Sequence, residues 1–128
     1  MDPVAHDLDL LADHLIEQSG ASSDGRATRS IDLGLGTLRL MAIGFVAGAE
    51  LPEHDNPGEA VLQVLRGSVR VVTIAPALVD GRELGPGRVV EAKPGLLVRI
   101  PDARHRVEAL EPSVILLTAV SLPGGSGH

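Results

Sequence analysis

Residues 48–67 read GAELPEHDNPGEAVLQVLRG, and residues 95–105 read GLLVRIPDARH. Each stretch opens on a glycine and combines a run of aliphatic residues with a proline and a histidine. Short apolar runs bounded by Gly, Pro or Asp-Gly continue from Ile31 almost to the C-terminus. Runs punctuated in this way are typical of short antiparallel strands, so the sequence predicts an all-β sandwich or barrel.

The apolar runs also give approximate bounds for the expected strands. These strands lie near Thr28–Leu33, Thr37–Val46, Ala60–Leu65, Val69–Ile74, Arg88–Glu91, Leu96–Ile100, His105–Ala109 and Val114–Val120. The Asp80-Gly81 pair and the glycines at 85 and 87 fit hairpin and loop connections between them.

The N-terminal segment has a helical pattern instead. Asp2 and Pro3 are the residue types of an N-cap and a first helical turn. Apolar residues then recur at helical spacing: Val4, Leu8, Leu11 and Leu15. The helix is expected to end near Gly20 and to use this stripe for packing.

Composition excludes several classes of function. The 128 residues carry a net charge of −6 and a single aromatic side chain, Phe45, so no footprint for nucleic acid is expected. The absence of cysteine excludes disulfides and thiol nucleophiles. No apolar stretch reaches the roughly 20 residues that a membrane helix needs. Asp2, Asp7 and Asp9 stand where a secretory signal would be basic and then apolar, so we expect a cytoplasmic protein.

The two stretches quoted above resemble the two motifs of the cupin family. The first cupin motif runs Gly-X5-His-X-His-X3–4-Glu-X6-Gly, and Gly48, His54 and Gly67 match it. The second runs Gly-X5-Pro-X-Gly-X2-His-X3-Asn, and Gly95 and Pro101 match its opening. The resemblance implies a cupin jelly-roll β-barrel with the short N-terminal α-helix packed on its outside. It also implies a homodimer, because cupins commonly pair through their strands.

This resemblance divides the chain into three parts. Residues 1–30 form the N-terminal helix and a linker, residues 31–122 form the cupin domain, and residues 123–128 form a disordered tail. The tail assignment follows from its glycine-rich composition at the end of the chain.

The departures from the motifs fall on the metal ligands. In cupins that bind a metal, three His and one Glu converge inside the barrel on a divalent ion, commonly iron, manganese, nickel or zinc. Here Asn56 stands at the second His position, Ala60 at the Glu position and Ala109 at the closing Asn position. The turn before His105 is also one residue shorter and lacks its glycine. The resemblance therefore implies either a reduced metal site at His54 and His105 or no metal at all.

Three further residues are candidate ligand or substrate contacts. Asn56 shares the even strand register of the first histidine if the segment is fully extended, and its alternative role is that of a turn former. Glu59 would complete a two-His, one-carboxylate set, the facial arrangement of non-haem iron, if Pro57-Gly58 form a bulge; otherwise it is solvated. Arg104, beside the second histidine, is a candidate contact for an anionic substrate, or else it keeps an edge strand soluble.

Two hypotheses of function stay open. The first is a small cupin of unknown substrate with a reduced metal or small-ligand site, acting as a metal-dependent oxygenase or isomerase. The second is a metal-free ligand-binding, sensor or accessory cupin without catalytic activity. No catalytic residue is assigned, since no serine lies in a strand-turn-helix elbow and the glycines around Leu35 lack a following helix or Lys. An aliphatic interior favours a modest apolar pocket for a small molecule.

Overall fold

The computed structural model describes residues 3–54, 58–73, 77–79, 82–84, 88–100 and 104–121. In chain order the elements are α1 (Leu8–Ala21), β1 (Arg26–Ile31), β2 (Arg39–Phe45), β3 (Glu50–His54), β4 (Gly58–Arg66), β5 (Val69–Thr73), β6 (Ala77–Val79), β7 (Arg82–Leu84), β8 (Arg88–Ala92), β9 (Leu97–Arg99), β10 (His105–Ala109) and β11 (Ser113–Ser121). The predicted all-β class with one N-terminal helix is confirmed. The helix in these ranges is not long and apolar enough to cross a membrane.

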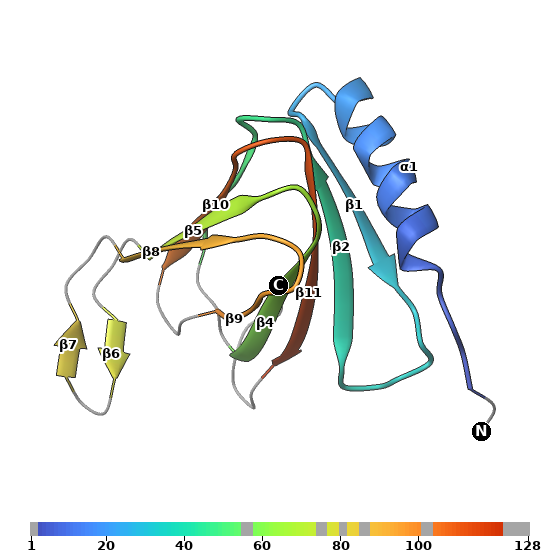
Figure 1. Cartoon of the computed structure of the whole chain (residues 1–128). Helices are drawn as coiled ribbons and strands as arrows, with labels where there is room; N and C mark the ends of the chain where they lie inside the picture. The colour runs from blue at the N-terminus through green and yellow to red at the C-terminus, as the bar shows by residue number, and fades with distance from the viewer. Residues whose placement is uncertain are drawn as a thin grey trace.

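The main strands form two antiparallel sheets that face each other (Figure 1). The five-stranded sheet has the order β1-β2-β11-β4-β9, and the four-stranded sheet has the order β3-β10-β5-β8. The chain passes from one sheet to the other between β3 and β4 and again between β4 and β5, as in a jelly roll. No backbone ladder joins the two sheets among the described strands, so side-chain packing closes the barrel.

An aliphatic core, the inner core, fills the space between the two sheets. Its buried members are Ile43, Phe45, Leu62, Val64, Val69, Val71, Ala92, Ile100, Val107, Ala109 and Ile115. Phe45, the single aromatic residue of the chain, is fully buried there. Full burial of one such large apolar side chain is worth roughly 1.5–3 kcal/mol, so this cluster is the main source of stability.

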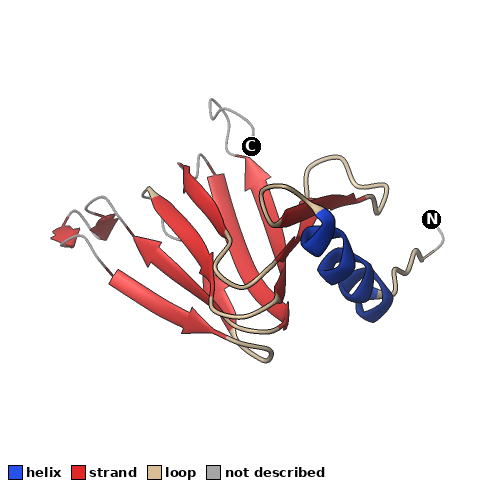
Figure 2. Ribbon diagram, turned by 90° about the horizontal axis from the view of Figure 1, so that it is seen from above, coloured by secondary structure: helices blue, strands red, loops and turns tan. Residues whose placement is uncertain are grey.

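Helix α1 covers the opposite face of the five-stranded sheet (Figure 2). The helix and the sheet together form a second cluster, the outer core, of Leu11, Ala12, Leu15, Ile31, Ala42, Val114 and Leu116. The five-stranded sheet is therefore buried on both faces where the helix lies. The packing role predicted for the helix stripe is confirmed for Leu11 and Leu15.

The predicted start of the helix is wrong by about one and a half turns. The N-cap is Asp7, whose side chain accepts a hydrogen bond of 3.0 Å from Leu10 N. Residues 3–7 are not helical, and Val4 is 58% exposed instead of belonging to the packed stripe. Asp2 and Asp7 offer similar capping chemistry, and the helix that buries Leu11 and Leu15 begins at the second of them.

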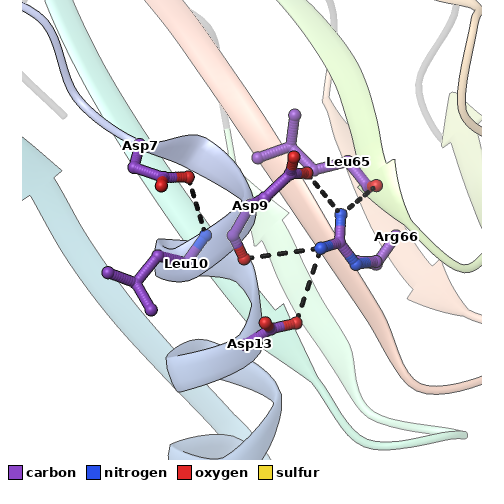
Figure 3. A network of polar contacts seen from close by, with 6 residues as sticks. All are labelled: Asp7, Asp9, Leu10, Asp13, Leu65 and Arg66. Carbon is purple, nitrogen blue, oxygen red and sulfur yellow. Dashed lines mark hydrogen bonds and ion pairs between the residues drawn. The ribbon is translucent and has the colours of Figure 1, made fainter.

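Arg66 connects the first turns of α1 to strand β4 (Figure 3). Its guanidinium lies 3.1 Å from Asp9 Oδ1 and 3.4 Å from Asp13 Oδ1. It also donates hydrogen bonds to the carbonyl oxygens of Asp9 and Leu65. Both carboxylates are largely exposed, so these ion pairs add modestly to the apolar packing that holds the helix.

Three strands escaped sequence prediction. Strand β3 contains Pro52, which is tolerated because β3 is an edge strand of its sheet. Strands β6 and β7 are short, and they pair through Val79 and Arg82 on either side of Asp80-Gly81. That pairing agrees with the predicted hairpin, although Asp80 and Gly81 lie outside the described residues.

The motif glycines have a backbone reason to be glycine. Gly48, Gly67 and Gly95 all have positive φ angles, between 76° and 101°. At Gly67 a Cβ atom would also collide with the backbone oxygen of Pro112 and the hydroxyl of Ser113. The turn that closes the first motif therefore packs directly on the chain entering β11.

Gly44 of β2 lets the helix approach the sheet, and this contact gives a first prediction. A Cβ atom at position 44 would lie 2.6 Å from the carbonyl oxygen of Leu15. We expect Gly44→Ala to lower the free energy of unfolding by about 1–3 kcal/mol, as overpacking does. Chemical denaturation measures this change.

The matched control is Gly36→Ala, because no atom lies within 4 Å of a Cβ built at Gly36. The control should unfold at nearly the parental denaturant concentration. Equal destabilisation by both variants would contradict close packing of the helix on Gly44.

Candidate functional site

The register of the four-stranded sheet arranges its inner positions in three rows. Strand β10 pairs with β3 on one side and with β5 on the other, and β5 pairs with β8. The first row is Ala109, Val69 and Ala92; the second is Leu51, Val107, Val71 and Val90; the third is His54, His105, Thr73 and Arg88. We call the third the polar row, since the sheet changes there from aliphatic to polar residues.

Strand β10 identifies the inner face. His105, Val107 and Ala109 are buried, whereas Arg106 and Glu108 between them are half-buried. Val107 and Ala109 belong to the inner core, so His105 continues their face at the end of the strand. The His105 side chain is only 2% exposed.

A β-bulge brings His54 into register with His105. The pairing of β3 with β10 shifts between His105 and Val107, so that Leu51 stands opposite Val107 and His54 stands opposite His105. Two steps along β10 therefore correspond to three steps along β3. Regular pairing would have placed Glu53 opposite His105, whereas the bulge places His54 there.

The five-stranded sheet contributes a facing row. Ala60 of β4 pairs with Ala119 of β11, and Ala119 pairs with Arg39 of β2. Ile100 joins the other side of Ala60, since its N–H donates a hydrogen bond of 2.9 Å to the Ala60 carbonyl oxygen. We call this set of Ile100, Ala60, Ala119 and Arg39 the facing row.

Two short connections show that both rows lie at one end of the barrel. Only residues 55–57 separate β3 from β4, and only residues 101–103 separate Ile100 from Arg104. Each connection covers four Cα–Cα steps, which span at most about 15 Å. The polar row and the facing row are therefore the two sides of a single barrel end.

Buried polar side chains mark the same place. Four are buried among the described residues: Ser19, Thr73, His105 and Ser113. Ser19 and Ser113 both donate to nearby backbone carbonyl oxygens. Thr73 is 7% exposed, and its hydroxyl forms no hydrogen bond with any residue that the structure describes. A buried hydroxyl without a protein partner points to a ligand or water as its partner.

The structure places the predicted contact residues differently. Ala60, at the family's Glu position, packs against the inner core. Glu59 is exposed and stands opposite Val120, and the register of β4 with β11 has no shift at this point. Strand β4 thus has no bulge beside Glu59; its register shift with β11 lies at the other end, near Leu65, and Pro57 lies outside the described residues.

Position 54 and position 60 also do not share one extended strand, because β3 ends at His54 and β4 begins in the other sheet. Asn56 lies outside the described residues. Arg104 is exposed at the entrance to β10, and Arg106 bonds Glu108 at 2.8 Å on the outer face. Ala109, at the family's Asn position, is buried two rows away from the histidines.

Sequence reasoning missed Thr73, Arg88 and Arg39. Thr73 is the last inward position of β5, after Val69 and Val71. Arg39 and Arg88 are instead the first inward positions of β2 and β8, and the inward positions that follow them are apolar. That break in apolar alternation is visible in the sequence. The sequence does not show that the three polar positions lie at the same end of the barrel.

The two imidazole positions fit a metal only in part. Directly opposite residues in an antiparallel pair have Cβ atoms about 4.5–5.5 Å apart, which allows two imidazoles to share one ion. No group of three His, Asp or Glu side chains suited to a metal occurs among the described residues. Of the family's four ligand positions, the described residues keep a histidine at two, His54 and His105.

A shallow surface depression lies away from the polar row. It is open to solvent and lies where the end of α1 meets the β2–β3 turn, lined by Ser19, Ser22, Asp24 and Gly48 among others. The Ser22 hydroxyl and the Arg26 backbone N–H both donate to Asp24 and lower the pKa of its carboxyl group. The Asp24 carboxylate therefore stabilises the turn between α1 and β1 through these hydrogen bonds.

The register gives a second prediction, and the absence of cysteine provides a clean background for it. We expect His54→Cys with His105→Cys to cross-link with a mild oxidant or a one-carbon bis-thiosulfonate, because opposite positions are within reach of a disulfide or one added carbon. Mass spectrometry of the digested protein detects the bridge. The control pairs Glu59→Cys with His105→Cys, and it should leave both thiols free. Equal cross-linking of the two pairs would contradict the register.

Comparison with known proteins supports the architecture. No family model matches the chain. No curated protein matches it either. Among solved structures, an RmlC-like cupin from Desulfovibrio desulfuricans is similar, with 24% identity over 74% of this chain and 81% of the other and a TM-score of 0.57. KdgF from Halomonas sp. is 20% identical over 76% of this chain and 80% of the other, with a TM-score of 0.55.

A salicylate 1,2-dioxygenase variant from Pseudoaminobacter salicylatoxidans, in complex with gentisate, has a TM-score of 0.68 at 16% identity. The match covers 87% of this chain and 32% of the dioxygenase, so the chain corresponds to about a third of that protein. These likenesses agree with the two facing sheets. The chain therefore has the cupin fold.

Proposed function

We propose that this chain is a small-ligand-binding cupin in which His54 and His105 hold one divalent transition metal at the polar row. The observation that carries the proposal is the direct pairing of these two residues across β3 and β10. Burial of His105 supports it, because a buried imidazole beside an aliphatic core is shielded from competing water. Iron, manganese, nickel and zinc are the candidate ions, since cupins commonly bind these four and imidazole suits iron, nickel and zinc.

Two protein ligands leave several coordination positions open for a small molecule. When bound, the metal would supply the Lewis-acid or redox chemistry that an oxygenase or isomerase requires. The chain's own residues have simpler tasks. Thr73, next to His105 in the row, can donate its hydroxyl proton to the ligand, and the small side chains of Ala60 and Ala119 leave room opposite.

A metal-free ligand-binding cupin is the second candidate. The observation that favours it is Ala60, which packs against the inner core where the family has a Glu ligand. In this case the polar row binds its ligand by hydrogen bonds and charge alone. Elemental analysis of protein purified without a chelator or an affinity metal separates the two candidates.

A homodimer belongs to the same proposal. Strands β8 and β9 lie at the edges of the two sheets, and they expose Val89 at 50% and Leu97 at 66%. Contact with a second copy would remove this apolar surface from water.

The third prediction tests the metal directly. We expect His54→Ala and His105→Ala each to lose most of the metal bound by the parent after dialysis against Mn(II), Ni(II) or Zn(II), measured by mass spectrometry of the elements. One remaining imidazole cannot hold the ion at the same occupancy. His14→Ala is the control, because His14 is exposed on α1. Equal metal content in all three variants would indicate adventitious binding.

The fourth prediction adds ligands back. Because Ala60 is an inward position of β4, Ala60→Glu together with Asn56→His should supply the two ligands that the family has and this chain lacks. We expect tighter Mn(II) or Ni(II) binding in calorimetric titration and a higher melting temperature with the ion present.

The control for the added carboxylate is Gln63→Glu with Asn56→His. Gln63 lies on the same strand but is exposed on the other face. A double variant with Ala60→Glu that folds yet binds no tighter than this control would mean that positions 54, 60 and 105 do not converge.

A further inference from the structure

Two arginines stand at the outer ends of the rows that form the barrel end. Arg88 follows Thr73 and His105 in the polar row. Arg39 follows Ala119 and Ala60 in the facing row. Both guanidinium groups therefore belong to strands that line the candidate site, one from each sheet.

Neither arginine is neutralised within the described part of the chain. Arg26, Arg66, Arg70 and Arg106 each bond a carboxylate at 3.2 Å or less. In contrast, no described residue forms an ion pair or a side-chain hydrogen bond with Arg39 or Arg88. A chain with 17 acidic and 11 basic residues thus leaves positive charge unpaired at this barrel end.

The two rows carry no acidic residue to oppose these charges. Their described members are imidazole, hydroxyl, aliphatic and guanidinium side chains. The acidic residues of the same strands stand at other positions: Glu108 and Glu91 bond Arg70 on the outer face, and Glu59 is exposed. Among their described members, the two rows thus carry positive charge and no negative charge, an arrangement that attracts small anions.

Thr73 supplies an independent observation. The residue is 7% exposed and lies between His105 and Arg88 in the row, and its hydroxyl has no partner among the described residues. Thr73 and Arg88 stand directly opposite each other, so their Cβ atoms are about 5 Å apart. The Thr73 hydroxyl and the Arg88 guanidinium can therefore each donate a hydrogen bond to one oxygen of the same carboxylate.

We propose that the ligand of this site is a small organic carboxylate, bound by Arg88 and Thr73 and attracted by Arg39. The assignment rests on the proposed function, because it names the ligand class of the same site. An organic acid fits better than an inorganic anion, since the second row beside it is wholly aliphatic: Leu51, Val107, Val71 and Val90. The carboxylate meets the polar row, and the apolar body meets Val90, the member of the second row beside Arg88 that stays 46% exposed.

The experiment compares acids with their neutral amides. Benzoate, hexanoate and succinate are each titrated into the full chain beside benzamide, hexanamide and succinamide, with binding measured by calorimetry or by chemical-shift changes of Thr73 and His105. We expect at least one acid to bind about tenfold or more tightly than its amide. Arg88→Gln should remove that preference, because a charge-assisted hydrogen bond is lost. Arg39→Gln should weaken binding by a smaller, salt-dependent factor.

Arg99→Gln is the matched control. Arg99 is exposed, also without a partner among the described residues, and stands opposite Val61 on the outer face of the five-stranded sheet. This variant should bind the acid as the parent does. Three results would overturn the assignment: no acid binding better than its amide, equal losses in Arg88→Gln and Arg99→Gln, or inorganic phosphate competing as strongly as the organic acids.

Repeating the titration before and after dialysis against a chelator separates this proposal from the metal site. If metal content depends on His54 and His105 but acids and amides bind alike, the ligand class is wrong and the metal site stands. If acid binding depends on Arg88 in protein that takes up no metal, the ligand class stands and the metal site fails.

Discussion

The register of strand β10 is the constraint on which the candidate site depends. This strand lies between β3 and β5, and its backbone hydrogen bonds decide which residues stand beside His105. The register is held by burial: Val107 and Ala109 fill the inner core, whereas Arg106 and Glu108 are bonded to each other on the outer face. A slip of one residue would bury that ion pair and expose both aliphatic side chains. Packing of the core thus fixes the chemistry at its edge.

The second sheet is fixed from both sides. The inner core holds one face of the five-stranded sheet and helix α1 holds the other, with the helix backbone close to Gly44. A strand buried on both faces cannot shift without disturbing two clusters. The facing row inherits this rigidity, because Ala60, Ala119 and Arg39 lie on the three strands β4, β11 and β2 in the middle of that sheet. A site on rigid strands keeps its geometry better than one built on loops.

Much of the fold could be predicted from the sequence because its signals are local. Glycines that need positive φ, such as Gly67, and short aliphatic runs between turns identify the motifs and the barrel. The site was harder to predict from the sequence, because it depends on pairing between strands that are distant along the chain. The sequence of residues 50–54, ELPEH, does not predict the bulge that places His54 opposite His105. Thr73 and Arg88 enter the site only through non-local register, and the choice of Asp7 over Asp2 as helix cap was decided by packing.

Loss of the family's glutamate has an electrostatic consequence for ligand and metal together. A divalent ion held by His54 and His105 alone would keep its full charge, because neutral imidazoles compensate none of it, and Arg88 stands in the same row. Ala60 cannot supply the missing negative charge, so an anionic ligand would have to compensate the charge of the ion. Metal and carboxylate would then raise each other's affinity by the same factor, as linkage requires. In the proposed site, alanine in place of a protein carboxylate would make metal occupancy depend on the ligand.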